Sequence, residues 1–252
     1  MLEVNEVSKR FGGIEALAGI SLAIGRGEIY GLIGPNGAGK TTLFNVLTGV
    51  YRADRGGFTF DGAPLNVKAP HQVAAAGIAR TFQNIRLFAN MSALENVMVG
   101  RHVRTRTGVF GAILRSAGAR AEERAIHERA RALLDYVGLA KRGNELAHSL
   151  PYGDQRRLEI ARALATEPKL LALDEPAAGM NPTETATLRS LLERIRADGT
   201  AILLIEHDMK LVMGLCDRIA VLDYGRKIAE GAPAAVRNDA AVIEAYLGGA
   251  LA

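Results

Sequence analysis

The residues best suited to hold a polyphosphate form one octapeptide, Gly34-Pro35-Asn36-Gly37-Ala38-Gly39-Lys40-Thr41. It fits the pattern GxxxxGK[ST] and lies between an apolar run at 28–33 and a helical spacing that starts at Thr42. Glycines let the backbone turn so that its N–H groups and the positive end of the next helix surround phosphate oxygens. Lys40 is expected to reach the β- and γ-phosphates, and the Thr41 hydroxyl to ligate Mg²⁺. The pattern predicts that residues 34–42 bind a nucleotide.

A second group of chemically capable residues follows the apolar run Leu170 to Leu173. Asp174 and Glu175 come where a buried parallel strand would end, which is where such folds present metal and water ligands. Asp174 is expected to hold Mg²⁺ through its water shell, and Glu175 to polarise a water in line with the γ-phosphate as general base. The alternative is a strand end with two surface charges. The octapeptide alone leaves kinases, GTPases and other ATPases open.

The elements that must position these residues change in character along the chain. Strands are expected over Val4 to Phe11, Ala16 to Ile24 and 28–33, separated by glycine turns. Residues from about 70 to 150 indicate helices, including a capping box at Ser92 and an amphipathic helix over about 121–137. From residue 169 strands and helices alternate, with a helix from Asn181 to Arg196 that begins Asn-Pro. This order predicts parallel α/β architecture interrupted by a helical lobe.

The gross properties restrict the class of protein. The 252 residues are 48% hydrophobic and 23% charged, with a formal net charge of +4, which is ordinary for a globular domain. No apolar run approaches the roughly 20 residues that a membrane helix needs. The acidic, strand-like start does not resemble a signal peptide, so a cytosolic location is expected. The single cysteine, Cys216, is predicted to be a buried small hydrophobe.

Residues Leu150 to Leu164, just before the second strand group, narrow the class further. They resemble the signature helix of the ATP-binding cassette (ABC) family, whose LSGGQ pattern addresses the γ-phosphate of ATP held by a second cassette. Here Leu150 and Gly153 match, Pro151 replaces serine, Tyr152 replaces the first glycine and Asp154 replaces glutamine. Proline has neither hydroxyl nor N–H, so one hydrogen bond to phosphate should be missing. The helix N-terminus and the Gly153 amide remain available, and the resemblance implies that residues 151–154, from Pro151 to Asp154, contact the nucleotide.

Other positions acquire roles only through this resemblance. Phe11 resembles the aromatic that stacks on adenine, with core packing as the alternative. Gln83 resembles the glutamine that approaches Mg²⁺ and the attacking water. His207 resembles the switch histidine that contacts the γ-phosphate, the alternative being a solvated histidine. Asn181 stands where the family commonly has aspartate.

The resemblance covers essentially the whole chain and implies one ABC ATPase domain over 1–252. The implied fold is α/β: a P-loop NTPase core with an N-terminal antiparallel β subdomain and an inserted α-helical subdomain. Residues 1–83 and 165–252 are expected to form the RecA-like core with the β subdomain. Residues 84–164 are expected to form the helical signature subdomain, with a basic insertion at 101–124.

Within the family, four stretches look like the ATP-binding subunit of branched-chain amino acid importers: 11–17, 80–100, 152–185 and 236–248. The implied protein hydrolyses ATP with Mg²⁺, is peripheral on the cytoplasmic face of the inner membrane, and pairs with an identical or paralogous ATPase subunit. Its other implied partners are permease subunits and, indirectly, a periplasmic binding protein; no nucleic acid is expected. The alternatives are amide or urea uptake, lipopolysaccharide export, and a soluble ABC ATPase that acts on nucleic acid.

Residues 101–120 are basic, with no acidic residue before Glu122 and Glu123. The arginines of this segment are Arg101, Arg104, Arg106, Arg115 and Arg120. The segment is either a solvated loop or a surface that lies near anionic lipid headgroups or the permease.

Overall fold

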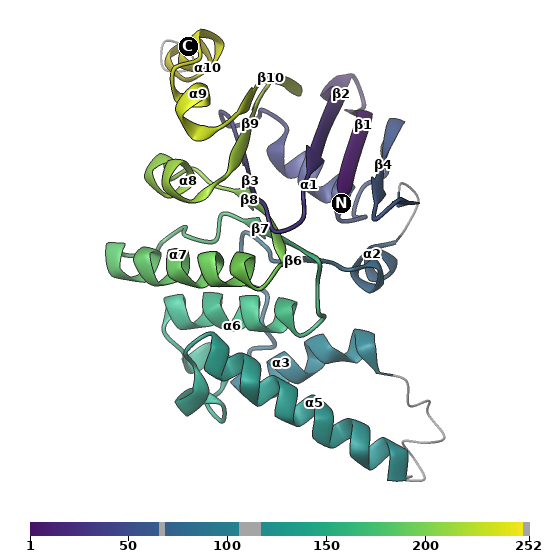
Figure 1. Cartoon of the computed structure of the whole chain (residues 1–252), viewed down its shortest axis with the longest axis vertical. Coiled ribbons are helices and arrows are strands. Elements are labelled where there is room, and N and C mark those ends of the chain that lie inside the picture. The colour runs from purple at the N-terminus through teal and green to yellow at the C-terminus, as the bar shows by residue number, and fades with distance from the viewer. Residues whose placement is uncertain (66–68, 106–116, 249–252) are drawn as a thin grey trace. The chain divides into compact units, whose positions relative to one another are not determined.

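The computed structural model of the chain describes residues 1–65, 69–105 and 117–248 (Figure 1). The chain divides into two compact units. The first unit joins Met1–Arg80 to Lys169–Ala252, and the second unit is Thr81–Pro168.

An antiparallel sheet of the first unit contains the N-terminal strands in the order β2-β1-β4-β5. Their bounds are β1 Leu2–Phe11, β2 Ile14–Ile24, β4 Arg55–Phe60 and β5 Ala63–Pro64. Buried Leu2 and Val4 alternate with exposed residues in β1, as expected of a sheet with one face on the core. Gly12 has φ +57°, in the left-handed region that favours glycine, at the turn between β1 and β2.

A second sheet of the first unit has the order β10-β9-β3-β8-β7-β6. Its strands are β3 Ile29–Ile33, β6 Ile78–Arg80, β7 Leu170–Asp174, β8 Ala201–Ile205, β9 Arg218–Asp223 and β10 Arg226–Gly231. The strands from β9 to β6 pair in parallel, and β10 pairs antiparallel at one edge. Every residue of β3, β7 and β8 is buried, because a parallel sheet is covered on both faces.

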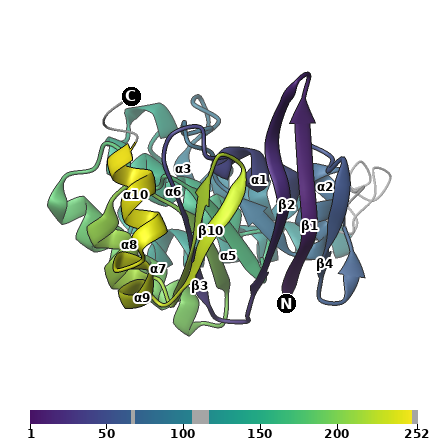
Figure 2. The same cartoon turned by 90° about the horizontal axis from the view of Figure 1, so that it is seen from above.

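The helices of the first unit are α1 Lys40–Leu47, α2 Pro70–Ala76, α7 Pro182–Ala197, α8 Met209–Leu215, α9 Pro233–Arg237 and α10 Ala240–Gly248. In α1, Leu43 and Phe44 are fully buried and join one hydrophobic cluster with residues of both sheets. Figure 2 shows α8, α9 and α10 grouped beside β10, with β1, β2 and β4 on the other side of that strand. The two sheets therefore share a core that includes the helix following the phosphate loop.

The second unit consists of helices and short turns. They are α3 Ala93–Arg101, η1 His102–Arg104, α5 Ala117–Tyr136, η2 Ala140–Arg142, η3 Ala147–Ser149 and α6 Tyr152–Leu164. Helices α3, α5 and α6 pack against one another (Figure 1). A Cβ at Gly100 would lie 2.2 Å from the carbonyl oxygen of Arg162, so only glycine permits this approach of α3 to α6. Fully buried Asn96 hydrogen-bonds the backbone of Phe88 and Ser92.

The predicted fold class is confirmed: a mixed α/β core with an antiparallel sheet and a helical insertion. The Ser92 and Asn181 helix starts form as expected, each with a reciprocal bond to a glutamate three residues later. Cys216 is buried, and burial raises the pKa of its thiol to about 12. Among the described residues, none of the helices has the length and apolar character needed to span a bilayer.

Candidate nucleotide-binding and hydrolysis site

The polar residues of the first unit gather at the carboxyl ends of three neighbouring parallel strands. Strand β3 lies between β9 and β8, and β8 pairs with β7. The phosphate loop follows β3, Asp174 ends β7, and His207 comes two residues after β8. Carboxyl ends of parallel strands meet at one edge of a sheet, which is where open α/β folds bind ligands.

Two glycines of the loop are fixed by close approach of other backbone segments. Gly34 has φ +146°, and a Cβ there would lie 2.0 Å from the carbonyl oxygen of Leu222. Gly39 has φ +100°, and a Cβ there would lie 2.6 Å from the carbonyl oxygen of Ala16. Gly39 is also the N-cap of α1 and places no side chain over the first amides of that helix. The loop therefore leaves the helix N-terminus open to an anion.

Lys40 is buried within this loop, with a side chain that bonds the loop itself. Its Nζ donates to the carbonyl oxygens of Gly34 at 2.7 Å and Pro35 at 2.9 Å. Burial lowers the pKa of Lys40, and the carboxylates of Glu175 and Asp174 oppose that shift. The predicted cation and the predicted carboxylates thus lie close enough to act on each other electrostatically.

The donor set fits Mg²⁺, which prefers oxygen ligands and keeps several waters. Asp174 is buried at the end of β7, and Thr41 is exposed at the second position of α1. A hydroxyl and a single carboxylate are the ligands that nucleotide-bound Mg²⁺ takes in phosphate-loop proteins. Both residues belong to the first unit.

Glu175 and His207 form a direct pair. His207 Nε2 lies 2.7 Å from Glu175 Oε1, and because an ionised carboxylate only accepts, a hydrogen bond here requires a proton on Nε2. Glu175 has φ +48°, an uncommon conformation for a residue other than glycine, and its N–H donates to the carbonyl oxygen of Ile205. The strand ends hold the backbone that aims this carboxylate.

Glu206, which the sequence analysis did not single out, supports the same edge. Its buried carboxylate accepts hydrogen bonds from the N–H groups of Ala177 at 2.7 Å and His207 at 3.0 Å. Burial raises the pKa of Glu206, whereas these backbone bonds lower it. Glu206 joins the segment after β7 to the segment after β8. The sequence offered one signal for this role: Glu206 stands directly between an apolar strand and His207.

Phe11 lies at the end of β1 with a partly exposed ring. It makes an edge-to-face contact with Tyr51, with ring centroids 5.2 Å apart, and Lys9 Nζ lies 5.4 Å from its centroid. The ring is 42% exposed, so it retains surface on which a base could stack. Tyr51 was not among the predicted site residues.

Tyr246 of α10 also reaches the loop. The backbone of Gly34 hydrogen-bonds its hydroxyl, and burial raises the pKa of Tyr246. Helix α10 therefore contacts the first residue of the phosphate loop. Nothing in the local sequence signals this contact, because the two residues lie far apart in the chain.

The signature residues and Gln83 belong to the second unit. Pro151 is the N-cap of α6 and provides no side-chain hydrogen bond. Tyr152 is exposed, whereas Gly153 and Asp154 are buried. The Asp154 carboxylate pairs with Arg157 at 2.5 Å and with Arg142 at 3.0 Å.

These contacts of Asp154 differ from those expected of the glutamine that it replaces. Its oxygens bind arginines of its own unit, and a role of Asp154 in nucleotide binding stays a prediction. Gln83 is exposed, and its carbonyl oxygen accepts a hydrogen bond from Arg156.

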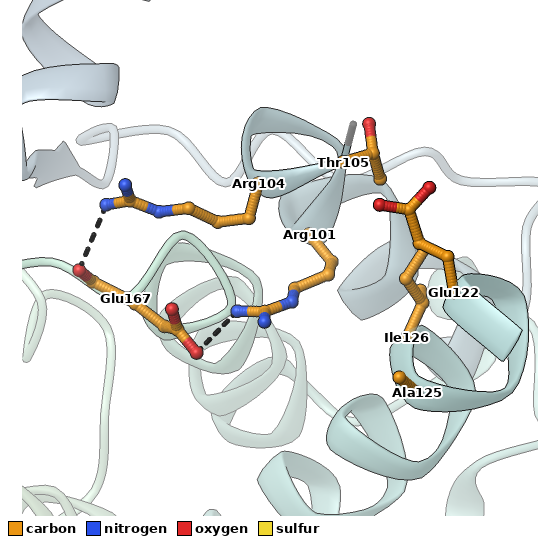
Figure 3. Close-up of a pocket in the computed structure, with 7 residues that line it drawn as sticks. All are labelled: Arg101, Arg104, Thr105, Glu122, Ala125, Ile126 and Glu167. Carbon is orange, nitrogen blue, oxygen red and sulfur yellow. Dashed lines mark hydrogen bonds and ion pairs between the residues drawn. The ribbon is translucent and has the colours of Figure 1, made fainter. Parts of the chain in front are cut away.

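The start of the basic segment contributes to a pocket of about 470 Å³ in the second unit (Figure 3). Arg101 pairs with the Glu167 carboxylate, and Arg104 donates to the carbonyl oxygens of Thr166 and Glu167. These two arginines therefore bond the turn after α6. Arg106 and Arg115 lie outside the described residues.

Comparison with known proteins agrees with this arrangement. The profile of the family described as ABC transporter matches residues 17–178, and that described as branched-chain amino acid ATP-binding cassette transporter matches residues 226–252. The chain belongs to the ABC transporter family, as one of its ATP-hydrolysing cassettes. The resemblance recognised from the sequence is confirmed.

A particular relative resembles the chain from end to end. The high-affinity branched-chain amino acid transport ATP-binding protein LivG of Salmonella typhimurium is 47% identical over 98% of both chains. The ADP conformation of an ATP-binding cassette of an ABC transporter has a TM-score of 0.86 and 32% identity over 98% of both chains. A dimeric cassette in a post-hydrolysis state, bound to ADP and Pi, has a TM-score of 0.78 and 25% identity over 92% of this chain and 99% of that one.

Proposed function

We propose that this chain is the ATP-hydrolysing subunit of an importer for branched-chain amino acids. The observation that carries the proposal is the pair of Glu175 and His207 beside the phosphate loop, in a chain that matches LivG over nearly its whole length. The match of residues 226–252 to the branched-chain profile supports this substrate class over amide or urea uptake and lipopolysaccharide export.

The residues of the first unit take distinct roles in ATP hydrolysis. The loop amides and Lys40 bind the phosphates, and Phe11 stacks on the adenine. Thr41 and Asp174 would hold Mg²⁺, with Gln83 approaching it, and the ion would supply positive charge beside the phosphates. The Glu175 carboxylate accepts a proton from the attacking water, while His207 holds one of its oxygens and contacts the γ-phosphate.

The remaining part of the site comes from a second cassette, identical or paralogous. The N-terminus of α6, with exposed Pro151 and Tyr152 and the Gly153 amide, addresses the γ-phosphate that the partner binds. The dimeric relative bound to ADP and Pi supports this pairing. The first unit acts as the nucleotide-binding core, and the second unit, Thr81–Pro168, acts as the helical subdomain that transmits closure to permease subunits. This subunit lies at the cytoplasmic face of the inner membrane as a peripheral protein.

The test is co-purification of this chain in detergent, followed by ATPase assays of the reconstituted complex. We expect integral permease subunits to co-purify, and ATPase activity to rise with a periplasmic binding protein loaded with leucine, isoleucine or valine. The same binding protein without ligand is the control. Stimulation by a urea- or amide-loaded protein, or co-purification with lipopolysaccharide or nucleic acid, would contradict the proposed substrate.

A further inference from the structure

Helix α6 of the second unit contains a fully buried ion pair that the roles above do not use. Arg156 Nη1 lies 2.9 Å from Glu159 Oε2, and their side chains are 0% and 1% exposed. The free energy needed to remove two charges from water offsets much of their electrostatic attraction. A buried ion pair therefore adds little to the stability of the fold by itself. Both side chains also bond groups outside the pair.

Arg156 bonds two consecutive carbonyl oxygens of the segment that contains Gln83. Its Nη1 donates to the carbonyl oxygen of Phe82 at 2.7 Å, and its Nη2 donates to the carbonyl oxygen of Gln83 at 2.8 Å. Nη2 also lies 3.2 Å from the hydroxyl of Tyr152, in the first turn of α6. One guanidinium therefore contacts both the Gln83 segment and the start of the signature helix.

Glu159 binds the same segment through its other oxygen. Its Oε1 accepts from the N–H groups of Phe82 and Arg86, each at 3.3 Å. Burial raises the pKa of Glu159, while Arg156 and these backbone bonds lower it. Arg162 also lies near enough to act on this carboxylate electrostatically.

We propose that Arg156 and Glu159 are positioning residues that hold the Gln83 segment to the signature helix, so that the two move as one body. The inference rests on the proposed function, because it gives Gln83 and α6 their significance. It also explains Tyr152, which supplies a hydroxyl where the family pattern has a glycine without a side chain. Arginine is required because a planar fork can bond several oxygens at once, which a lysine ammonium cannot do in the same geometry.

An apolar pair of similar volume could fill the same space without loss of stability. It could not bond two carbonyl oxygens and two N–H groups of residues 82–86. The buried charges therefore serve a segment whose Gln83 side chain is itself exposed. Together, Arg156 and Glu159 set the position of the Gln83 backbone relative to the first turn of α6.

The test compares Arg156→Lys and Glu159→Gln in the whole chain by hydrogen exchange. We expect exchange at the Phe82 and Arg86 amides to become roughly tenfold faster or more, because their charged acceptor is lost or displaced. Glu159→Gln is the milder change and keeps the proposal testable if Arg156→Lys folds poorly. Asn96→Ala is the matched control: it removes a fully buried polar side chain of the same unit, whose bonds go to 88–92.

The kinetic readout uses the complex with its permease subunits. We expect kcat to fall about tenfold in both variants, with ATP affinity of the isolated chain unchanged because the phosphate loop is in the other unit. Asn96→Ala should lower the melting temperature without this loss of kcat. Unchanged exchange at 82 and 86 in both variants would overturn the proposal, as would faster exchange with native kcat. The exchange result needs no ATPase activity, so failure of the proposed function remains distinguishable.

Discussion

The phosphate loop and the signature helix are held by the fold in different ways. The loop, Glu175 and His207 extend from the ends of buried parallel strands, and the Glu175 N–H donates to the carbonyl oxygen of Ile205 at the end of the neighbouring strand. The signature helix starts at Pro151 with no side-chain cap and is held by charged side chains, among them Arg156. A site built on strand ends is fixed by the sheet, whereas one built on a helix start depends on a few specific bonds.

The largest effect is expected at the strand-end region. Glu175→Gln removes the proposed base but keeps the side-chain shape, so kcat of the assembled complex should fall roughly 10²- to 10⁴-fold while ATP still binds. Steady-state hydrolysis and equilibrium binding of ATP measure the two quantities. Glu193→Gln, which alters an exposed pair on α7, is the control. Native turnover in Glu175→Gln would remove Glu175 as the base.

The next largest effect should follow from Lys40→Met. Loss of a charged hydrogen-bond donor to phosphate should weaken ATP binding about 10- to 100-fold. Because burial already lowers the pKa of Lys40, an apolar replacement should leave the melting temperature of the nucleotide-free chain unchanged or higher. Fluorescence titration and thermal melts check both points, with exposed Lys210→Met as control. Equal ATP affinity in the two variants would show that Lys40 does not bind phosphate.

A smaller gain is expected from Pro151→Ser in the signature helix. A serine hydroxyl can bond phosphate in the closed complex, which should raise ATP affinity or turnover roughly tenfold. It can also cap α6 in the free chain, which should add about 1 kcal/mol to the free energy of unfolding. Pro151→Ala removes the ring without supplying the hydroxyl and separates these causes. Unchanged ATPase rate and affinity of the complex in Pro151→Ser would contradict a missing bond at this position.

The smallest change concerns the start of α7. Asn181 Oδ1 accepts from the Glu184 N–H at 3.0 Å, so Asn181→Ala should lower the free energy of unfolding by about 1 kcal/mol. For a chain of this size the melting temperature should fall by roughly 2–4 °C. Asn181→Asp retains a capping oxygen and should melt like the native chain. A loss of equal size in Asn181→Asp would show that the cap is not the cause.

The strand-end region could be predicted from the sequence because its signals are local. The octapeptide, the apolar run before Asp174 and the Asn181-Pro182 helix start each lie within a few residues of what they determine. Strands β4 and β10 were missed because two glycines interrupt the apolar alternation of the first, and the second is a mostly polar edge strand.

The contacts of the second unit were much less predictable. Arg156 bonds carbonyl oxygens more than 70 residues earlier in the chain, and Asp154 pairs with Arg142 across a turn. Charge and spacing within α6 do not reveal these partners, since a run of arginines commonly lies in solvent. The contact of Tyr246 with Gly34 could not be predicted for the same reason, because only the folded chain brings α10 to the loop.

Hydrogen exchange at both regions of the Glu175→Gln complex tests the shared site most directly. With Mg²⁺ and ATP, amides of residues 34–41 and of Tyr152 and Gly153 should both exchange more slowly, because the γ-phosphate contacts each. With ADP, only residues 34–41 should be protected. The result holds for an identical or a paralogous partner. If ATP protects the loop while Tyr152 and Gly153 exchange at the same rate with ATP, ADP and no nucleotide, the signature helix does not address the γ-phosphate.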